Sequence, residues 1–150
     1  MGSIAISNLN IPVAGTFMFA AESGDHFLLD GFLRTSMQWQ KLQSCKMFKR
    51  LGFKTKEDLR SMIRSITTAK NLKMPEAPDC IVLITALDDY FINHRSAKGL
   101  WDYWQGSILW YVYGGHVFGF ISHVGKWCDA VELSLNKLEK VTSSDKPCKA

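Results

Sequence analysis

The sequence of 150 residues has few of the features that mark metal, redox or membrane proteins. Its four cysteines form no C-x-x-C pair, which argues against a zinc ribbon or a thioredoxin-type site and favours reduced thiols. Its four histidines form no H-x-x-x-H pair, so we expect no metal site and no cofactor. A run of about 18 apolar residues is missing as well, so we expect no transmembrane segment.

The excess of positive over negative charge is also small. Lys and Arg number 18 and Asp and Glu 14, and the net charge of +4 is too small to indicate a nucleic-acid partner. The apolar N-terminus has no basic region and is interrupted by Asn8, Asn10 and Pro12, so no targeting segment is recognised and the compartment stays unknown. With 47% hydrophobic and 21% charged residues, the composition is that of a soluble globular protein and excludes disorder.

Three short apolar runs predict β-strands, at residues 12–19, 80–87 and 108–113. Helical patterns separate them, and strands that alternate with helices indicate an α/β fold with a parallel sheet. Several helical segments lie between the first two strands, and the clearest of them begins with a capping-box pattern at Thr55 and Asp58. We interpret these segments as a helical insertion over the sheet.

Two helical segments carry apolar side chains at helical spacing. In the first segment the predicted buried stripe is Leu59, Met62, Ile63 and Ile66. In the second, which covers residues 117–140, one face carries Val131, Leu135 and Leu138.

Two of the predicted strands end in residues suited to acid–base chemistry. Residues 80–87 are followed by Asp88 and Asp89, and residues 108–113 are followed by two glycines and His116. Because the carboxyl ends of neighbouring parallel strands meet at one edge, an aspartate there can orient His116 as in a nucleophile–His–acid triad. The alternative is that the aspartate is a turn or cap residue and His116 a structural histidine.

A nucleophile for such a triad is missing from the sequence. The nucleophile elbow of α/β-hydrolases reads G-x-S-x-G, and no such pattern occurs. Gly115 and Gly119 have the right spacing, but Val117 stands where the serine belongs. We therefore expect this chain alone to perform no covalent acyl transfer.

Two stretches carry a resemblance to a known family. Residues 82–93 (VLITALDDYFIN) resemble the strand-plus-acid segment of alpha/beta hydrolases, and residues 108–120 (ILWYVYGGHVFGF) resemble their last strand and catalytic-histidine turn. The sequence is most similar to alpha/beta hydrolase domain-containing protein 18-like proteins. The resemblance implies a partial alpha/beta-hydrolase fold, a short parallel sheet of about three strands flanked by helices. It also implies a C-terminal part of the hydrolase domain at residues 1–142, followed by a polar tail at residues 143–150.

The resemblance assigns roles to individual residues. It implies Asp89 as the acid and His116 as the base, with Asp88 as a rival for the acid. It also implies that Met1 corresponds to the residue after the family's serine, so that the nucleophile and the early strands would precede this sequence. In the complete protein the reaction would be hydrolysis of an ester, thioester or lipid acyl group.

Two further expectations follow for partners. A non-catalytic pseudo-hydrolase that acts as an interaction module is the alternative to an enzyme fragment. In a sheet of this size the strand at residues 12–19 would have an open apolar edge, which favours self-association.

Overall fold

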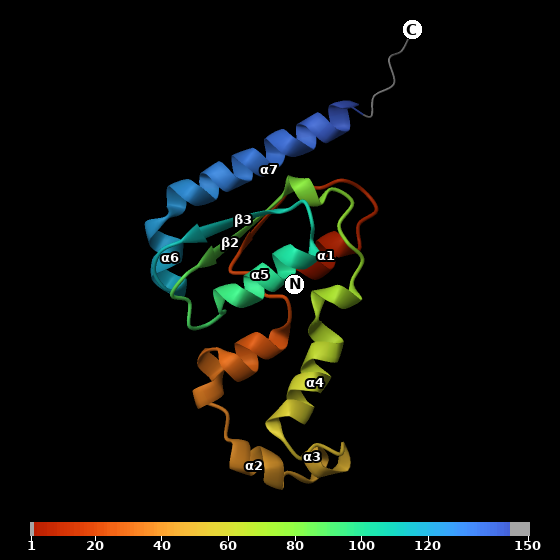
Figure 1. Cartoon of the computed structure of the whole chain (residues 1–150), viewed down its shortest axis with the longest axis vertical. Helices are drawn as coiled ribbons and strands as arrows, with labels where there is room; N and C mark the ends of the chain where they lie inside the picture. Colours follow the sequence, from red (N-terminus) through yellow and green to blue (C-terminus); the bar gives the residue numbers. More distant parts are fainter. Residues whose placement is uncertain (1, 145–150) are drawn as a thin grey trace.

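The computed structural model contains a small sheet covered by helices on both faces (Figure 1). Its strands are β1 (Gly15–Met18), β2 (Ile81–Ala86) and β3 (Ile108–Val112), in the order β1-β2-β3, and both pairs are parallel. The predicted α/β class and the three-stranded parallel sheet are therefore confirmed. β1 is shorter than predicted, because its pairing with β2 begins only at Gly15, opposite Ile81.

The structure describes residues 2–144. Of the residues predicted as a polar tail, Ser143 and Ser144 belong to the last turn of α7 (Val124–Ser144). Residues 145–150, which include Cys148, lie outside the described residues.

β2 is the centre of the protein, and all six of its residues are buried. Successive side chains of a strand point to opposite faces, so β2 contributes to two separate cores. On one face its Val82, Ile84 and Ala86 pack with Trp127 and Ala130 of α7. On the other face its Ile81 and Leu83 pack with residues of α1 (Gly2–Ser7) and α5 (His94–Tyr103), namely Ile6 and Leu100, and with Trp104.

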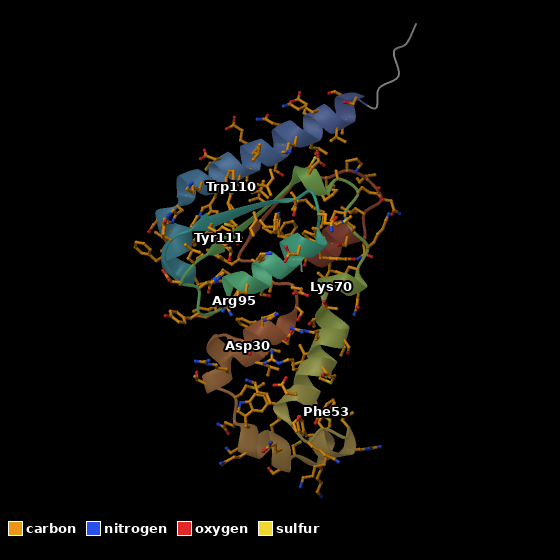
Figure 2. All side chains as sticks on the ribbon, viewed as in Figure 1. Asp30, Phe53, Lys70, Arg95, Trp110 and Tyr111 are labelled. Carbon is orange, nitrogen blue, oxygen red and sulfur yellow. The ribbon has the colours of Figure 1, made fainter. Side chains whose placement is uncertain are left out.

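The residues between β1 and β2 form a helical insertion as predicted, but it extends away from the sheet and does not lie over it (Figure 1). Asp30 lies at the end of the insertion near the sheet, and Phe53 lies farther away (Figure 2). Its helical elements are η1 (His26–Asp30), η2 (Phe32–Thr35), α2 (Trp39–Ser44), α3 (Lys46–Arg50) and α4 (Lys56–Thr67). The short helices η3 (Ala69–Asn71) and η4 (Pro78–Cys80) follow and lead back to β2. Extended backbone at Gly31 separates η1 from η2, and extended backbone at Cys45 separates α2 from α3.

The capping box predicted for α4 is confirmed. The hydroxyl of Thr55 accepts a hydrogen bond from the backbone N–H of Asp58 at 3.2 Å, and the Asp58 carboxylate accepts one from the N–H of Thr55 at 2.8 Å. The predicted buried stripe is only partly correct. Leu59 and Ile63 are buried, but Ile66 is 71% exposed, because the insertion core ends at Ile63.

The single helix predicted at residues 117–140 is two helices, α6 (His116–Ser122) and α7, with a break at His123. Val131 and Leu135 share a face of α7, but they are 46% and 54% exposed. Within residues 2–144, no helix is both long and apolar enough to cross a lipid bilayer.

Candidate acid–base site at the carboxyl end of the sheet

The loops that follow β2 and β3 are joined by backbone hydrogen bonds. The N–H of Leu87 donates to the carbonyl of Val112 at 3.0 Å, and the N–H of Asp88 donates to that of Gly114 at 3.2 Å. Gly114 adopts a φ of 95°, a left-handed conformation that glycine reaches without steric cost, and this turn starts α6 at His116. The two strand ends therefore place the loop aspartates directly beside His116.

The side chains of Asp89 and His116 form a hydrogen-bonded pair. Nδ1 of His116 lies 2.8 Å from Oδ2 of Asp89. The other carboxylate oxygen, Oδ1, accepts the backbone N–H groups of Phe91 at 2.7 Å and Ile92 at 2.9 Å. The Asp89 side chain is completely buried, whereas that of His116 is 32% exposed. One member of the pair is thus fixed inside the protein while the other reaches the surface.

This arrangement determines which nitrogen of His116 is free to react. An ionised carboxylate can only accept hydrogen bonds, so Nδ1 is the donor and Nε2 is left to take up or release a proton. Asp88, the alternative acid from the sequence, is exposed, and Asp89 is the aspartate that contacts His116.

The rings of Phe19 and Phe91 both contact His116, and the sequence pattern did not predict these contacts. Their centroids lie 4.6 Å and 5.0 Å from the imidazole centroid. The contact of Phe91 could have been predicted, because Phe91 is close to Asp89 in the sequence. Phe19 follows β1, seventy residues earlier in the chain than Asp89, and only the sheet order brings it near.

A glycine in α6 allows the helix to approach the end of the sheet closely. A Cβ atom on Gly119 would lie 3.2 Å from Cβ of Ala86 and 3.6 Å from the Phe19 ring. Any larger residue there would push α6, and with it His116, away from the sheet. Gly119 therefore helps to set the position of the base.

The insertion forms a wall of a cavity beside Asp89. The cavity has a volume of about 390 Å³ and lies between the insertion and the loop that follows β2. Its lining residues are Asp30, Gly31, Arg34, Thr35, Asp89, Tyr90 and Asn93.

A second group of titratable side chains lies where the insertion leaves the sheet. Ligand atoms of Asp25, His26 and Asp30 lie within 4.8 Å of one another, which is a spacing compatible with a metal ion. Arg60 binds both carboxylates, at 3.0 Å from Asp25 and 2.7 Å from Asp30, and Arg64 lies 3.2 Å from Asp25. These arginines already neutralise the carboxylates, so the group is an ion-pair network.

The network changes the acidity of its members. The guanidinium of Arg60 hydrogen-bonds Asp30 and holds the pKa of that carboxyl below its ordinary value of 3.8. The same bond raises the pKa of Arg60 above its usual range. Both groups are therefore charged at neutral pH, and the network stays intact there.

The other two histidines hydrogen-bond to backbone carbonyls. Nδ1 of His94 lies 3.1 Å from the carbonyl of Leu87, and Nδ1 of His123 lies 3.2 Å from that of Gly119. Of the cysteines within residues 2–144, Cys80 is buried and two are exposed, and all three are free.

Comparison with known proteins identifies the family. The family model described as "Alpha/beta hydrolase domain containing 18" matches residues 41–137, which include β2, β3 and both members of the Asp89–His116 pair. The chain belongs to this family. The resemblance seen in the sequence is thus confirmed, and the three-stranded parallel sheet is a partial alpha/beta-hydrolase fold. No curated protein and no solved structure matches this chain.

Proposed function

We propose that this chain supplies the acid, Asp89, and the base, His116, of a serine hydrolase that cleaves carboxylic esters or related acyl bonds. The observation that supports this most directly is the 2.8 Å contact between Nδ1 of His116 and Oδ2 of Asp89. In such a triad the acid holds the histidine in one tautomer and stabilises the imidazolium. Nε2 of His116 would take the proton of the serine and return it to the leaving group.

The proposal requires a nucleophile, and the 150 residues contain no G-x-S-x-G elbow. We propose that a serine supplied by residues outside this sequence completes the triad. Sequencing the transcript upstream of Met1 tests this directly. A reading frame that passes through a G-x-S into Met1 supports the proposal, and a stop codon immediately upstream favours a non-catalytic role.

Active-site labelling gives the chemical test. A fluorophosphonate probe should not label this chain alone, and it should label a form extended through the serine. In that extended form, His116→Ala and Asp89→Asn should each lower kcat for a p-nitrophenyl ester by about 10³- to 10⁴-fold. His94→Ala is the matched control and should leave kcat unchanged, because the hydrogen bond of His94 goes to the backbone carbonyl of Leu87 and not to the Asp89–His116 pair. Labelling of the unextended chain, or full activity in His116→Ala, would refute the proposal.

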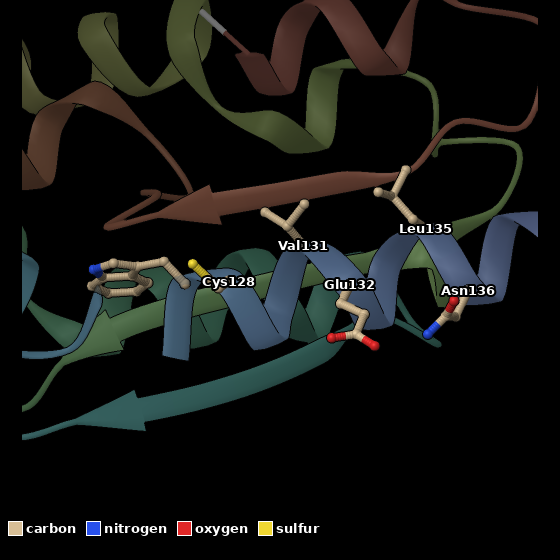
Figure 3. A pocket seen from close by; sticks show the side chains of 6 residues that line it. Cys128, Val131, Glu132, Leu135 and Asn136 are labelled. Atoms are coloured by element: carbon tan, nitrogen blue, oxygen red, sulfur yellow. The ribbon is translucent and has the colours of Figure 1, made fainter. Parts of the chain in front are cut away.

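A second candidate function is an interaction module, and the edge of the sheet favours it. Within residues 2–144, no strand pairs with the outer edge of β1. Val131 and Leu135 of α7 point toward β1 (Figure 3), although both are about half exposed. A groove of about 200 Å³ lies between them and β1, lined by Ala14, Gly15, Thr16, Val131, Ser134 and Leu135.

An open strand edge with apolar side chains beside it is a surface on which another strand can pair. We propose that in this role the chain would associate through β1, including with copies of itself. Light scattering over a range of protein concentrations tests the idea. Association that is weakened by Val131→Lys, with no change for the exposed Glu132→Lys on the other side of α7, supports it (Figure 3). A compact monomer at every concentration contradicts it.

A further inference from the structure

Two phenylalanine rings contact the imidazole of His116 from different parts of the chain. The ring of Phe19 is inclined to the imidazole by 37° and that of Phe91 by 36°, with centroid distances of 4.6 Å and 5.0 Å. Phe19 is buried and Phe91 is half-buried. Close ring contacts of this kind restrict the rotation of a side chain and attract it toward preferred orientations.

Phe19 makes its contact from a strained backbone. Its φ is 54°, and within residues 2–144 it is the one residue other than glycine with a positive φ. Aromatic residues rarely adopt this conformation, and such strain persists where the surroundings enforce it, often at functional sites. Here the N–H of Phe19 donates to the carbonyl of Ile84 at 2.8 Å, and its ring packs on Trp127 at 5.7 Å.

Phe91 contacts both members of the acid–base pair. Its backbone N–H donates to Oδ1 of Asp89 at 2.7 Å, while its ring lies against His116. A displacement of Phe91 would therefore disturb the carboxylate and the imidazole together. Phe19, in contrast, follows β1 and contacts His116 through its ring.

We propose that Phe19 and Phe91 are positioning residues that hold Nδ1 of His116 on Asp89 and leave Nε2 for the nucleophile. This inference rests on the proposed function for its catalytic meaning, but its geometric content can be tested in the present chain. Without the two rings, His116 would sample other rotamers, and its Nδ1 proton would exchange with water more often. The ring contacts make this exchange slow.

Imidazole NMR on the whole chain is the experiment. In the wild type, nuclear Overhauser contacts should connect the His116 ring protons to both phenyl rings. Phe91→Leu and Phe19→Leu should each accelerate exchange of the Nδ1 proton by about 3- to 10-fold. Phe91→Tyr keeps the ring and should retain the wild-type rate. Phe53→Leu is the matched control, because Phe53 contacts Phe48 in the insertion and should leave the rate unchanged.

The outcomes separate this inference from the proposed function. If Phe19→Leu fails to fold, the wild-type contacts and Phe91→Leu decide the question. Missing contacts in the wild type, or a folded Phe91→Leu with the wild-type exchange rate, would overturn the inference. Slow exchange and intact contacts, combined with no esterase activity in the extended form, would refute the proposed function and leave the positioning role standing. In an active extended form, Phe91→Leu should lower kcat with little change in KM.

Discussion

In the sheet, β2 lies between two apolar layers and buries all six of its residues, whereas the described side chains of the insertion form a small core with four buried members. The insertion is also stabilised by ion pairs and by a helix cap. Its Arg60 joins Asp25, Asp30 and Glu57, and its longest helix begins with a capping box. The acid–base pair is built on the apolar part, and the insertion contributes a wall of the cavity beside Asp89. Loss of the Arg60 ion pairs should therefore loosen that wall before it disturbs the Asp89–His116 pair.

The largest effect is expected from a cavity in the sheet. Leu83→Ala removes a fully buried side chain and should lower the free energy of unfolding by about 2–5 kcal/mol. Urea denaturation measures this loss. Ile66→Ala, at a side chain that is 71% exposed, should stay within about 0.5 kcal/mol of the wild type. Equal losses in the two variants would show that the sheet is not the main source of stability.

A smaller effect, confined to the insertion, is expected from Arg60→Met. The change leaves the buried Asp25 with Arg64 as its remaining arginine and Asp30 without one, which should cost about 2–4 kcal/mol. Trp39 is the one tryptophan of the insertion, so its indole NMR signal should broaden or shift while the other four stay unchanged. Arg50→Met, at an exposed arginine of α3, is the control. Matching changes in all five tryptophans would contradict separate stabilisation of the two regions.

Removal of the helix cap should act on a single helix. Thr55→Ala takes away the acceptor for the N–H of Asp58 and should cost about 1 kcal/mol. Amide hydrogen exchange should become faster in the first turn of α4 and stay unchanged in β2. Ser61→Ala, at an exposed position inside α4, should not accelerate that exchange.

The smallest effect is expected when the pH is lowered. Hydrogen bonds hold the pKa values of Asp30 and Asp58 below 3.8, Asp30 through Arg60 and Asp58 through the backbone of Lys54 and Thr55. A carboxyl whose pKa is lower in the folded state stabilises the fold above its unfolded pKa, and this contribution is lost as the pH falls through the folded pKa. The Trp39 signal should therefore change below pH 3.8, before the sheet signals change. Asp30→Asn should weaken this response, and an unaltered response would contradict its assignment.

The pattern of the sequence was sufficient to predict β2, the capped helix and the placement of Asp89 and His116 after neighbouring strands. Each of these depends on local chemistry or on the rule that parallel strands end at one edge. The division of the insertion into short helices at Gly31 and Cys45 was not predicted, because packing decides short helices more than local preference does. Ile66 was wrongly predicted to be buried, since periodicity shows which face of a helix is apolar and not where its partner ends.

By itself, the sequence determined the class of the fold, the order of its strands and helices, and the residue types available for acid–base chemistry. It did so because the alternation of apolar runs, caps and turns acts over short distances along the chain. Only the tertiary structure decided that Asp89 and not Asp88 meets His116, that Phe19 and Phe91 enclose the imidazole, and that Arg60 joins two carboxylates. Most of these contacts join residues that are far apart in the sequence. The choice between the neighbours Asp88 and Asp89 depends on which side chain is buried and faces His116.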